Sequence, residues 1–268
     1  MRYSESDMRF LARVVGETPE AAASYVRAWQ LDPERIEPWF DDERVLRQLM
    51  ADDNSIVEVS PRFLFTVLLR RIRRDLASIP YTVERVEPDG RLVVFDAPVV
   101  HELLRADEMF QYLVNLLVSF ERIDTVTVRG AQPRSPMRRL NTFNMDDMVE
   151  LAGMVDAPLR PLICRRIGDI ALFVTGIFQE AIRRTARRPL ASPFTRMFVG
   201  RWRRIEDYEA DGRRFYGMAA DQLRDVQPDL ARVLARLAGD FTIARKPLAV
   251  LAERYVTWAR PHWVSGPS

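Results

Sequence analysis

The segment "PLICRRIGDIALFVTGIFQEAIRRTARR", residues 161–188, decides the fold class. Its pattern is largely helical, and its centre is apolar or small on every side apart from the hydroxyl of Thr175. A helix without a polar face is a buried helix. We therefore predict that residues 167–178 form an almost wholly buried helix in which Phe173 and Ile177 are both covered. The Thr175 hydroxyl should bond back to a carbonyl of the same helix.

One acidic side chain, Asp169, lies inside this apolar segment, between Gly168 and a nine-residue apolar run. A buried carboxylate must be paired or must change its pKa. Asp169 could therefore be a buried acid tuned for function in a pocket. The alternative is a structural role, as the N-cap of the following helix or in a buried ion pair with an arginine. We favour the structural role.

Outward from this segment, helical periodicity dominates the chain, as in the apolar stripe of residues 60–78. The clearest β signal is "YTVERVEPDGRLVVFD", residues 81–96, where two extended runs flank a turn at 88–90. The segment "TVTVR", residues 125–129, is a second strand candidate. The sequence thus predicts a mainly α fold: a helical body with one β-hairpin at about 81–96, and with residues 125–129 as the candidate for one further short strand.

The best linker candidate is "GAQPRSPMRRLNTF", residues 130–143, which holds two prolines and a glycine and has no apolar periodicity. It separates an N-terminal helical half with the hairpin, residues 1–129, from a C-terminal helical half, residues 144–268. Both halves carry very apolar helices, so we expect them to pack into one body.

The single cysteine, Cys164, excludes a disulfide within the chain and indicates a reducing compartment. The first residues lack the apolar run of a signal peptide. The longest uncharged apolar run, residues 170–178, is about half of what spans a bilayer. We therefore expect a cytoplasmic protein without a membrane span.

The 40 basic residues include one lysine, Lys246, and are otherwise arginine. Coding in a GC-rich genome explains this preference, so the number of arginines is weak support for nucleic-acid binding. Their distribution is more informative. Residues 1–60 carry a net charge of −6, whereas residues 161–205 carry +8. Such asymmetry suggests a binding partner, or that the two regions face each other.

The most basic stretch is "RRTARRPLASPFTRMFVGRWRR", residues 183–204, with eight arginines and no acid. Its aromatic residues Phe194, Phe198 and Trp202 recur every four positions. Arginines interleaved with aromatic rings can bind single-stranded nucleic acid, but the same spacing is one face of a helix that docks on a core. Arginines at the end of the preceding helix complement its dipole. The better candidates for a ligand or partner surface are Arg196, Arg201, Trp202, Arg203 and Arg204.

The usual catalytic motifs are missing. There is neither a Gly-rich phosphate loop nor a nucleophile elbow. "HELLR", residues 101–105, begins like a zinc motif, but Arg105 replaces the second histidine. The acidic segment 207–218 ends in Met218 where a calcium loop needs a glutamate. Residues 41–96 have the order of a winged helix, but the expected recognition helix begins with core residues. We predict no catalytic residues, no metal and no cofactor.

These observations favour a non-enzymatic intracellular interaction or regulatory protein with a basic surface around 183–204. Its partner would be a protein or a small anionic or apolar ligand, and nucleic acid is the less favoured partner. Two alternatives stay open. One is a helical binding protein for an apolar or anionic small ligand, with its cavity near residues 170–178 and 109–120. The other is nucleic-acid binding through the Arg/aromatic segment.

Overall fold

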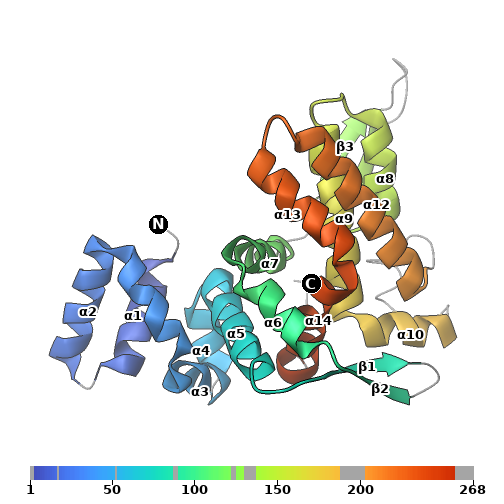
Figure 1. Ribbon diagram of the computed structural model, residues 1–268. Helices are drawn as coiled ribbons and strands as arrows, with labels where there is room; N and C mark the ends of the chain where they lie inside the picture. The colour runs from blue at the N-terminus through green and yellow to red at the C-terminus, as the bar shows by residue number, and fades with distance from the viewer. Residues whose placement is uncertain are drawn as a thin grey trace.

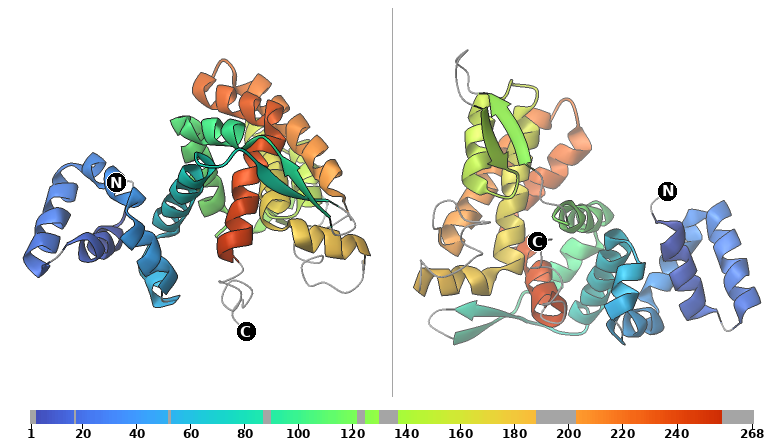
Figure 2. Two further views of the ribbon diagram at one scale, coloured as in Figure 1. Left: turned by 60° about the horizontal axis from the view of Figure 1, so that its bottom comes forward. Right: turned by 180° about the vertical axis from the view of Figure 1, so that it is seen from behind.

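The computed structural model describes residues 3–16, 18–51, 53–86, 90–121, 125–129, 137–187 and 203–256. Within these residues the protein is mainly α-helical with a β-hairpin, which confirms the fold class predicted from the helical periodicity. The helices form an elongated arrangement, with the N-terminal helices at one end (Figures 1 and 2).

The first part of the chain forms α1 (Glu5–Val15), α2 (Pro19–Leu31), the 3-10 helix η1 (Pro33–Asp41), α3 (Glu43–Ala51), α4 (Asp53–Glu58) and α5 (Pro61–Leu76). Local capping explains where these helices begin. The side chains of Ser4, Thr18 and Ser60 each accept a hydrogen bond from a backbone N–H three residues further on. Proline occupies the first position of α2 and of α5, where its missing N–H costs nothing.

The rest of the chain forms α6 (Ala97–Arg105), α7 (Asp107–Ser119), α8 (Met145–Met154), α9 (Arg160–Ile177), α10 (Gln179–Arg187), α12 (Ile205–Leu223), α13 (Pro228–Gly239), α14 (Phe241–Leu251) and the π-helix η2 (Ala252–Val256). Helices α5, α6, α7 and α14 occupy the middle of the molecule, and α8, α9, α12 and α13 lie on the side away from α1 and α2 (Figures 1 and 2).

The predicted hairpin is confirmed. Strand β1 (Thr82–Val86) pairs antiparallel with β2 (Gly90–Val94), so that Thr82 lies opposite Val94 and Val86 lies opposite Gly90. Of the predicted turn, only Gly90 is within the described residues, and it is the first residue of β2.

A second antiparallel pair joins β3 (Thr125–Arg129) to β4 (Met137–Asn141). Strand β3 is the further short strand that the sequence predicted. Strand β4 lies inside the segment 130–143 for which the sequence predicted only a linker. Its residues, Met-Arg-Arg-Leu-Asn, carry little alternation of apolar and polar side chains, so their backbone pairing left no local signal.

Helix α9 is buried along the segment 167–178, as predicted. Phe173 and Ile177 are partly buried and pack against the hydrophobic core. The Thr175 hydroxyl donates a hydrogen bond to the carbonyl of Ala171 at 2.7 Å, which is the predicted bond within the helix. No helix in the described part of the chain, α9 included, is long and apolar enough to cross a membrane.

Glycines let α9, α12 and α14 approach one another closely. A Cβ atom on Gly168 of α9 would lie 2.6 Å from the ring of Tyr216 in α12. A Cβ atom on Gly212 of α12 would lie 2.3 Å from the ring of Phe241 in α14. Since real Cβ contacts are not this short, any larger residue would push the helices or the rings apart.

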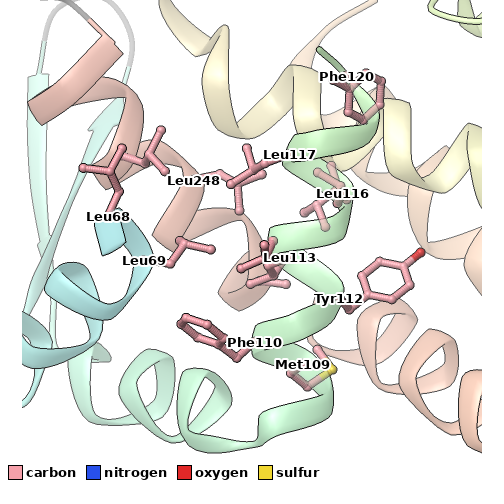
Figure 3. Packing of buried hydrophobic residues seen from close by; sticks show 14 of the residues in the cluster. Leu68, Leu69, Met109, Phe110, Tyr112, Leu113, Leu116, Leu117, Phe120 and Leu248 are labelled. Carbon is pink, nitrogen blue, oxygen red and sulfur yellow. The ribbon is translucent and has the colours of Figure 1, made fainter. Parts of the chain in front are cut away.

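Apolar side chains join the middle helices. Leu68 and Leu69 of α5, Leu113 and Leu117 of α7 and Leu248 of α14 converge in one cluster (Figure 3). Burial of each such side chain contributes roughly 1.5–3 kcal/mol. Because α14 belongs to the C-terminal half of the chain, this cluster is shared by the two halves that flank residues 130–143.

Acidic residues of the N-terminal region pair with arginines of α5. The Arg70 guanidinium binds the carboxylates of Glu37 and Asp41, and Arg71 lies 2.9 Å from Glu43. This end of the molecule lies opposite α10 in every view (Figures 1 and 2). Glu37, Asp41 and Glu43 are therefore paired within the N-terminal half of the chain, and whether the acidic region faces the basic segment 183–204 stays a prediction.

Candidate functional site

The outward face of the β1–β2 hairpin carries large apolar side chains in water. Successive side chains of a strand point to opposite faces, so Tyr81 and Val83 share one face with Val93 and Phe95. Val83 lies opposite Val93, and they are 46% and 48% exposed. The ring of Tyr81 meets the ring of Phe95 edge-on at 6.1 Å, yet Phe95 is 77% exposed. We call these four residues the outward hairpin face.

The outward hairpin face belongs to an arm. The hairpin extends from α6 past α14 (Figures 1 and 2). Leu92, on the opposite face of β2, is also exposed, as is Val99 in the first turns of α6. Arg91, at the turn end of β2, is 69% exposed and reaches Glu253 only at 4.0 Å. A contiguous exposed apolar patch beside an available cation is typical of an interaction surface.

The opposite face of the hairpin is held to the body by buried charges. Lys246 of α14 is 5% exposed, and its Nζ lies 2.6 Å from the Glu84 carboxylate of β1. The same ammonium donates to the carboxylate of Asp96, which precedes α6, and to the Thr82 hydroxyl at 3.2 Å. The Thr82 hydroxyl in turn donates to Asp96 at 2.6 Å, which closes a ring of hydrogen bonds. We call Lys246, Thr82, Glu84 and Asp96 the ammonium site.

Arg245 adds a second buried cation beside the ammonium site. It is 7% exposed, with its Nε 3.2 Å from Glu209 of α12 and an Nη 3.9 Å from Glu84. The Nε is close enough for an ion pair, but its geometry does not make a hydrogen bond. Glu84 therefore lies between two cations of α14, and the hairpin is tied through α14 to α12.

Asp169 is at the centre of a second buried cluster. Its Oδ1 accepts hydrogen bonds from the hydroxyls of Tyr112 in α7 at 2.6 Å and of Tyr216 in α12 at 2.8 Å. Its Oδ2 lies 3.7 Å from Nε of Arg165, which also donates to the Tyr112 hydroxyl at 3.2 Å. Asp169 lies within α9, so it is not an N-cap; the structure gives it the arginine partner that we had considered and two tyrosines besides.

Burial governs ionisation in this cluster. It raises the pKa of Asp169 above that of an ordinary aspartate, against the opposing effect of Arg165 and of the tyrosine hydrogen bonds. Burial, together with the nearby carboxylate, also holds the pKa of Tyr112 and of Tyr216 well above the ordinary value, so both are neutral donors. The arrangement ties α7, α9 and α12 together through one acceptor.

The predicted basic surface is described only in part. Arg196, Arg201 and Trp202 lie outside the described residues. Arg203 is described, and its guanidinium binds the carboxylate of Asp146 in α8 and lies 3.7 Å from Asp211 in α12.

Arg204 is exposed and is the N-cap residue of α12, where its backbone N–H donates to Asp207 at 2.9 Å. Arg203 thus joins two helices, and whether the other arginines bind a partner stays a prediction. The small-ligand and nucleic-acid alternatives also stay predictions.

The other candidates from the sequence are placed as follows. Cys164 is buried in α9, and burial raises the pKa of its thiol, which disfavours the reactive thiolate. Across the described ranges, no group of three or more His, Cys, Asp and Glu residues is placed to hold a metal ion.

Sequence reasoning missed both the outward hairpin face and the ammonium site. A signal for the first was present, since Tyr81 and Val83 alternate with polar residues before the turn. A signal for the second was the presence of a single lysine in an arginine-rich chain. The second signal does not identify the partners of Lys246, which lie 150 residues or more away in the sequence.

Comparison of the chain with family models, with curated proteins and with solved structures gives no match.

Proposed function

We propose that this protein is a non-enzymatic interaction protein and that the outward hairpin face is its contact surface for a protein partner. The observation that carries the proposal is the exposure of Tyr81, Val83, Val93 and Phe95 together on one face. Full burial of a large apolar side chain contributes roughly 1.5–3 kcal/mol, and these four side chains, which are 41–77% exposed, forgo a corresponding part of it. A partner that covers them recovers much of that free energy.

The chemistry of the arm favours a partner that offers an extended segment. A two-stranded sheet leaves backbone N–H and C=O groups unpaired along its outer edges, and an added strand can pair with them. Alternate apolar side chains of such a strand would pack beside those of the outward hairpin face and reduce their exposure. An acidic side chain would meet Arg91, whose only described carboxylate neighbour is 4.0 Å away.

The test is photo-crosslinking in the cells that make the protein. A photoreactive amino acid replaces Val93 in one variant and Asp229 in a control variant. Asp229 is 91% exposed on α13, far from the outward hairpin face, and so measures random encounters. We expect position 93 to give a defined protein adduct that position 229 does not give. The adduct should disappear when Val83→Ser and Phe95→Ser are added.

Two outcomes would contradict the proposal. One is equal adduct formation at positions 93 and 229. The other is an adduct at position 93 that contains nucleic acid or lipid and no protein.

We also propose a cytoplasmic location, in keeping with the single, unpaired Cys164. Fractionation of the producing cells tests it, and recovery of the protein outside the cytoplasm would contradict it.

A further inference from the structure

The geometry points to Lys246 as the residue that positions the outward hairpin face, through a site that accepts an ammonium ion and excludes a guanidinium ion. Only the step from hairpin position to partner contact rests on the proposed function. The step from Lys246 to hairpin position stands on the contacts of the ammonium site alone.

Lys246 is unusual in the composition of the chain. Of 40 basic residues it is the only lysine, and every other basic position is an arginine. The one lysine that is kept is 5% exposed, although a lysine is almost never fully buried unless it is paired. The contacts of this buried lysine therefore have to show whether its surroundings fit an ammonium better than a guanidinium.

The contacts explain the choice. An ammonium group has three donors and no acceptor. Here the three acceptors are the Glu84 carboxylate at 2.6 Å, the Asp96 carboxylate and the Thr82 hydroxyl at 3.2 Å. A guanidinium is larger and planar and has five N–H donors in a fixed fork. At this position it would have to displace Thr82 and would leave buried donors without acceptors.

The neighbouring residue shows that acceptors are already scarce. Arg245 is an arginine in the same buried region, and its Nε is left without a hydrogen bond although Glu209 is 3.2 Å away. A second guanidinium beside it would compete for Glu84, from which Arg245 is 3.9 Å away.

The ammonium site also fixes the arm. Thr82 and Glu84 belong to β1, and Asp96 lies between β2 and α6. The Nζ atom of Lys246 therefore holds the start of β1 and the segment that follows β2 against α14, at the end of the hairpin away from its turn. Few other backbone segments of the described helices approach β1 or β2 closely. An isolated two-stranded hairpin is marginally stable in water. Loss of the ammonium should therefore release the arm while α9 and α12 stay folded.

Hydrogen exchange tests this inference on the full chain. Peptides covering residues 82–94 report on the hairpin, and peptides covering α9 and α12 are the internal control. We expect Lys246→Arg to speed exchange in the hairpin about tenfold or more, with little change in α9 and α12. Arg91→Gln removes a cation from the same arm outside the ammonium site and should leave exchange unchanged. Hairpin exchange in Lys246→Arg equal to that of the wild type would overturn the inference.

Chemical rescue separates an ammonium site from a general need for bulk or charge. Lys246→Ala lacks the atoms that n-propylammonium supplies. We expect n-propylammonium, and neither n-propylguanidinium nor n-propanol, to restore slow exchange over residues 82–94. Equal rescue by the guanidinium compound would refute the ammonium-specific site. If Lys246→Ala does not fold, Thr82→Val removes one acceptor without removing charge and should also speed hairpin exchange. No change in Thr82→Val would count against the inference.

The proposed partner contact and the ammonium site can each be rejected without rejecting the other. The wild type with a photoreactive residue at position 93 could show a protected hairpin and no protein adduct. That result would reject the partner contact and leave the ammonium site standing. In the opposite case, with a specific adduct at position 93, wild-type protection in Lys246→Arg would reject the ammonium site alone.

Discussion

Asp169 and Lys246 are both ionisable side chains buried in the helical part of the molecule, and their partners differ in kind. Asp169 accepts hydrogen bonds from two neutral tyrosines, with one arginine 3.7 Å away. Lys246 lies between two carboxylates and a hydroxyl. The first cluster joins three helices of the core, whereas the second joins a helix to an arm.

The difference indicates what each cluster is for. An acid held by neutral donors can lose its charge and keep its hydrogen bonds, because the amide or the protonated acid still offers an acceptor oxygen. If a cation between two carboxylates loses its charge, both partly buried anions lose an ion-pair partner, and Asp96 has no second one among the described residues. The Asp169 cluster should therefore tolerate neutralisation, and the ammonium site should not.

The largest effect is expected for Lys246→Met, which removes the charge and keeps much of the side-chain volume. Glu84 and Asp96 would be left partly buried without their cation, which costs about 3–5 kcal/mol for a broken buried pair. Urea unfolding would measure the loss. Arg91→Gln, which removes an exposed cation of the same hairpin, should change the free energy of unfolding by less than about 0.5 kcal/mol. Similar losses in the two variants would erase the distinction between the ammonium site and a surface ion pair.

The next effect is expected for Gly168→Ala, which attacks the Asp169 cluster by shape alone. The new Cβ would meet the Tyr216 ring at 2.6 Å and displace the hydroxyl that donates to Asp169. We expect a loss of about 2–3 kcal/mol from overpacking and the lost hydrogen bond. Gly217→Ala is the matched control, since it lies beside Tyr216 in α12 and its Cβ would meet nothing within 4 Å. If Gly168→Ala had the melting temperature of the wild type, the close contact between residue 168 and the Tyr216 ring would not be needed to keep Tyr216 in place.

The smallest effect is expected for Asp169→Asn, which keeps an acceptor for both tyrosines and removes the charge. At neutral pH the free energy of unfolding should change by less than about 1 kcal/mol.

The pH dependence of this variant has a definite sign. Burial raises the pKa of Asp169 in the folded state, so the folded protein keeps that proton to higher pH than the unfolded chain does. Relative to Asp169→Asn, the wild type should lose stability as pH rises from the ordinary aspartate pKa to the raised one, and the difference should then level off. Denaturant unfolding of both proteins from about pH 3 to about pH 7 measures this. A wild type that gains stability over that window would mean that Arg165 outweighs burial.

The sequence predicted those features that are local. The buried helix α9 follows from uniform apolarity within residues 167–178, and the hairpin follows from two extended runs and a turn. Thr175 bonds to Ala171, four residues away, and this bond was predicted because a helix fixes that distance. Asp169 was recognised as a buried acid from its apolar neighbours in the chain.

The partners of these residues could not be predicted, because they come from far along the chain. Tyr112 and Tyr216 are 57 and 47 residues from Asp169, and Thr82 is 164 residues from Lys246. Arg203, predicted as a ligand residue, is bound by Asp146, 57 residues away. Which side of the hairpin faces solvent also depends on where α14 packs, and no periodicity within residues 81–96 contains that information.

The central claim, that a buried lysine ammonium holds the hairpin, has a direct spectroscopic test. Since Lys246 is the only lysine, a nitrogen-15 spectrum selective for side-chain ammonium groups contains one lysine signal and needs no assignment. We predict one slowly exchanging ammonium signal at neutral pH that shifts in Thr82→Val and stays unchanged in Arg91→Gln. Absence of a slowly exchanging signal, as for a lysine open to water, or a signal insensitive to Thr82→Val, would contradict the claim.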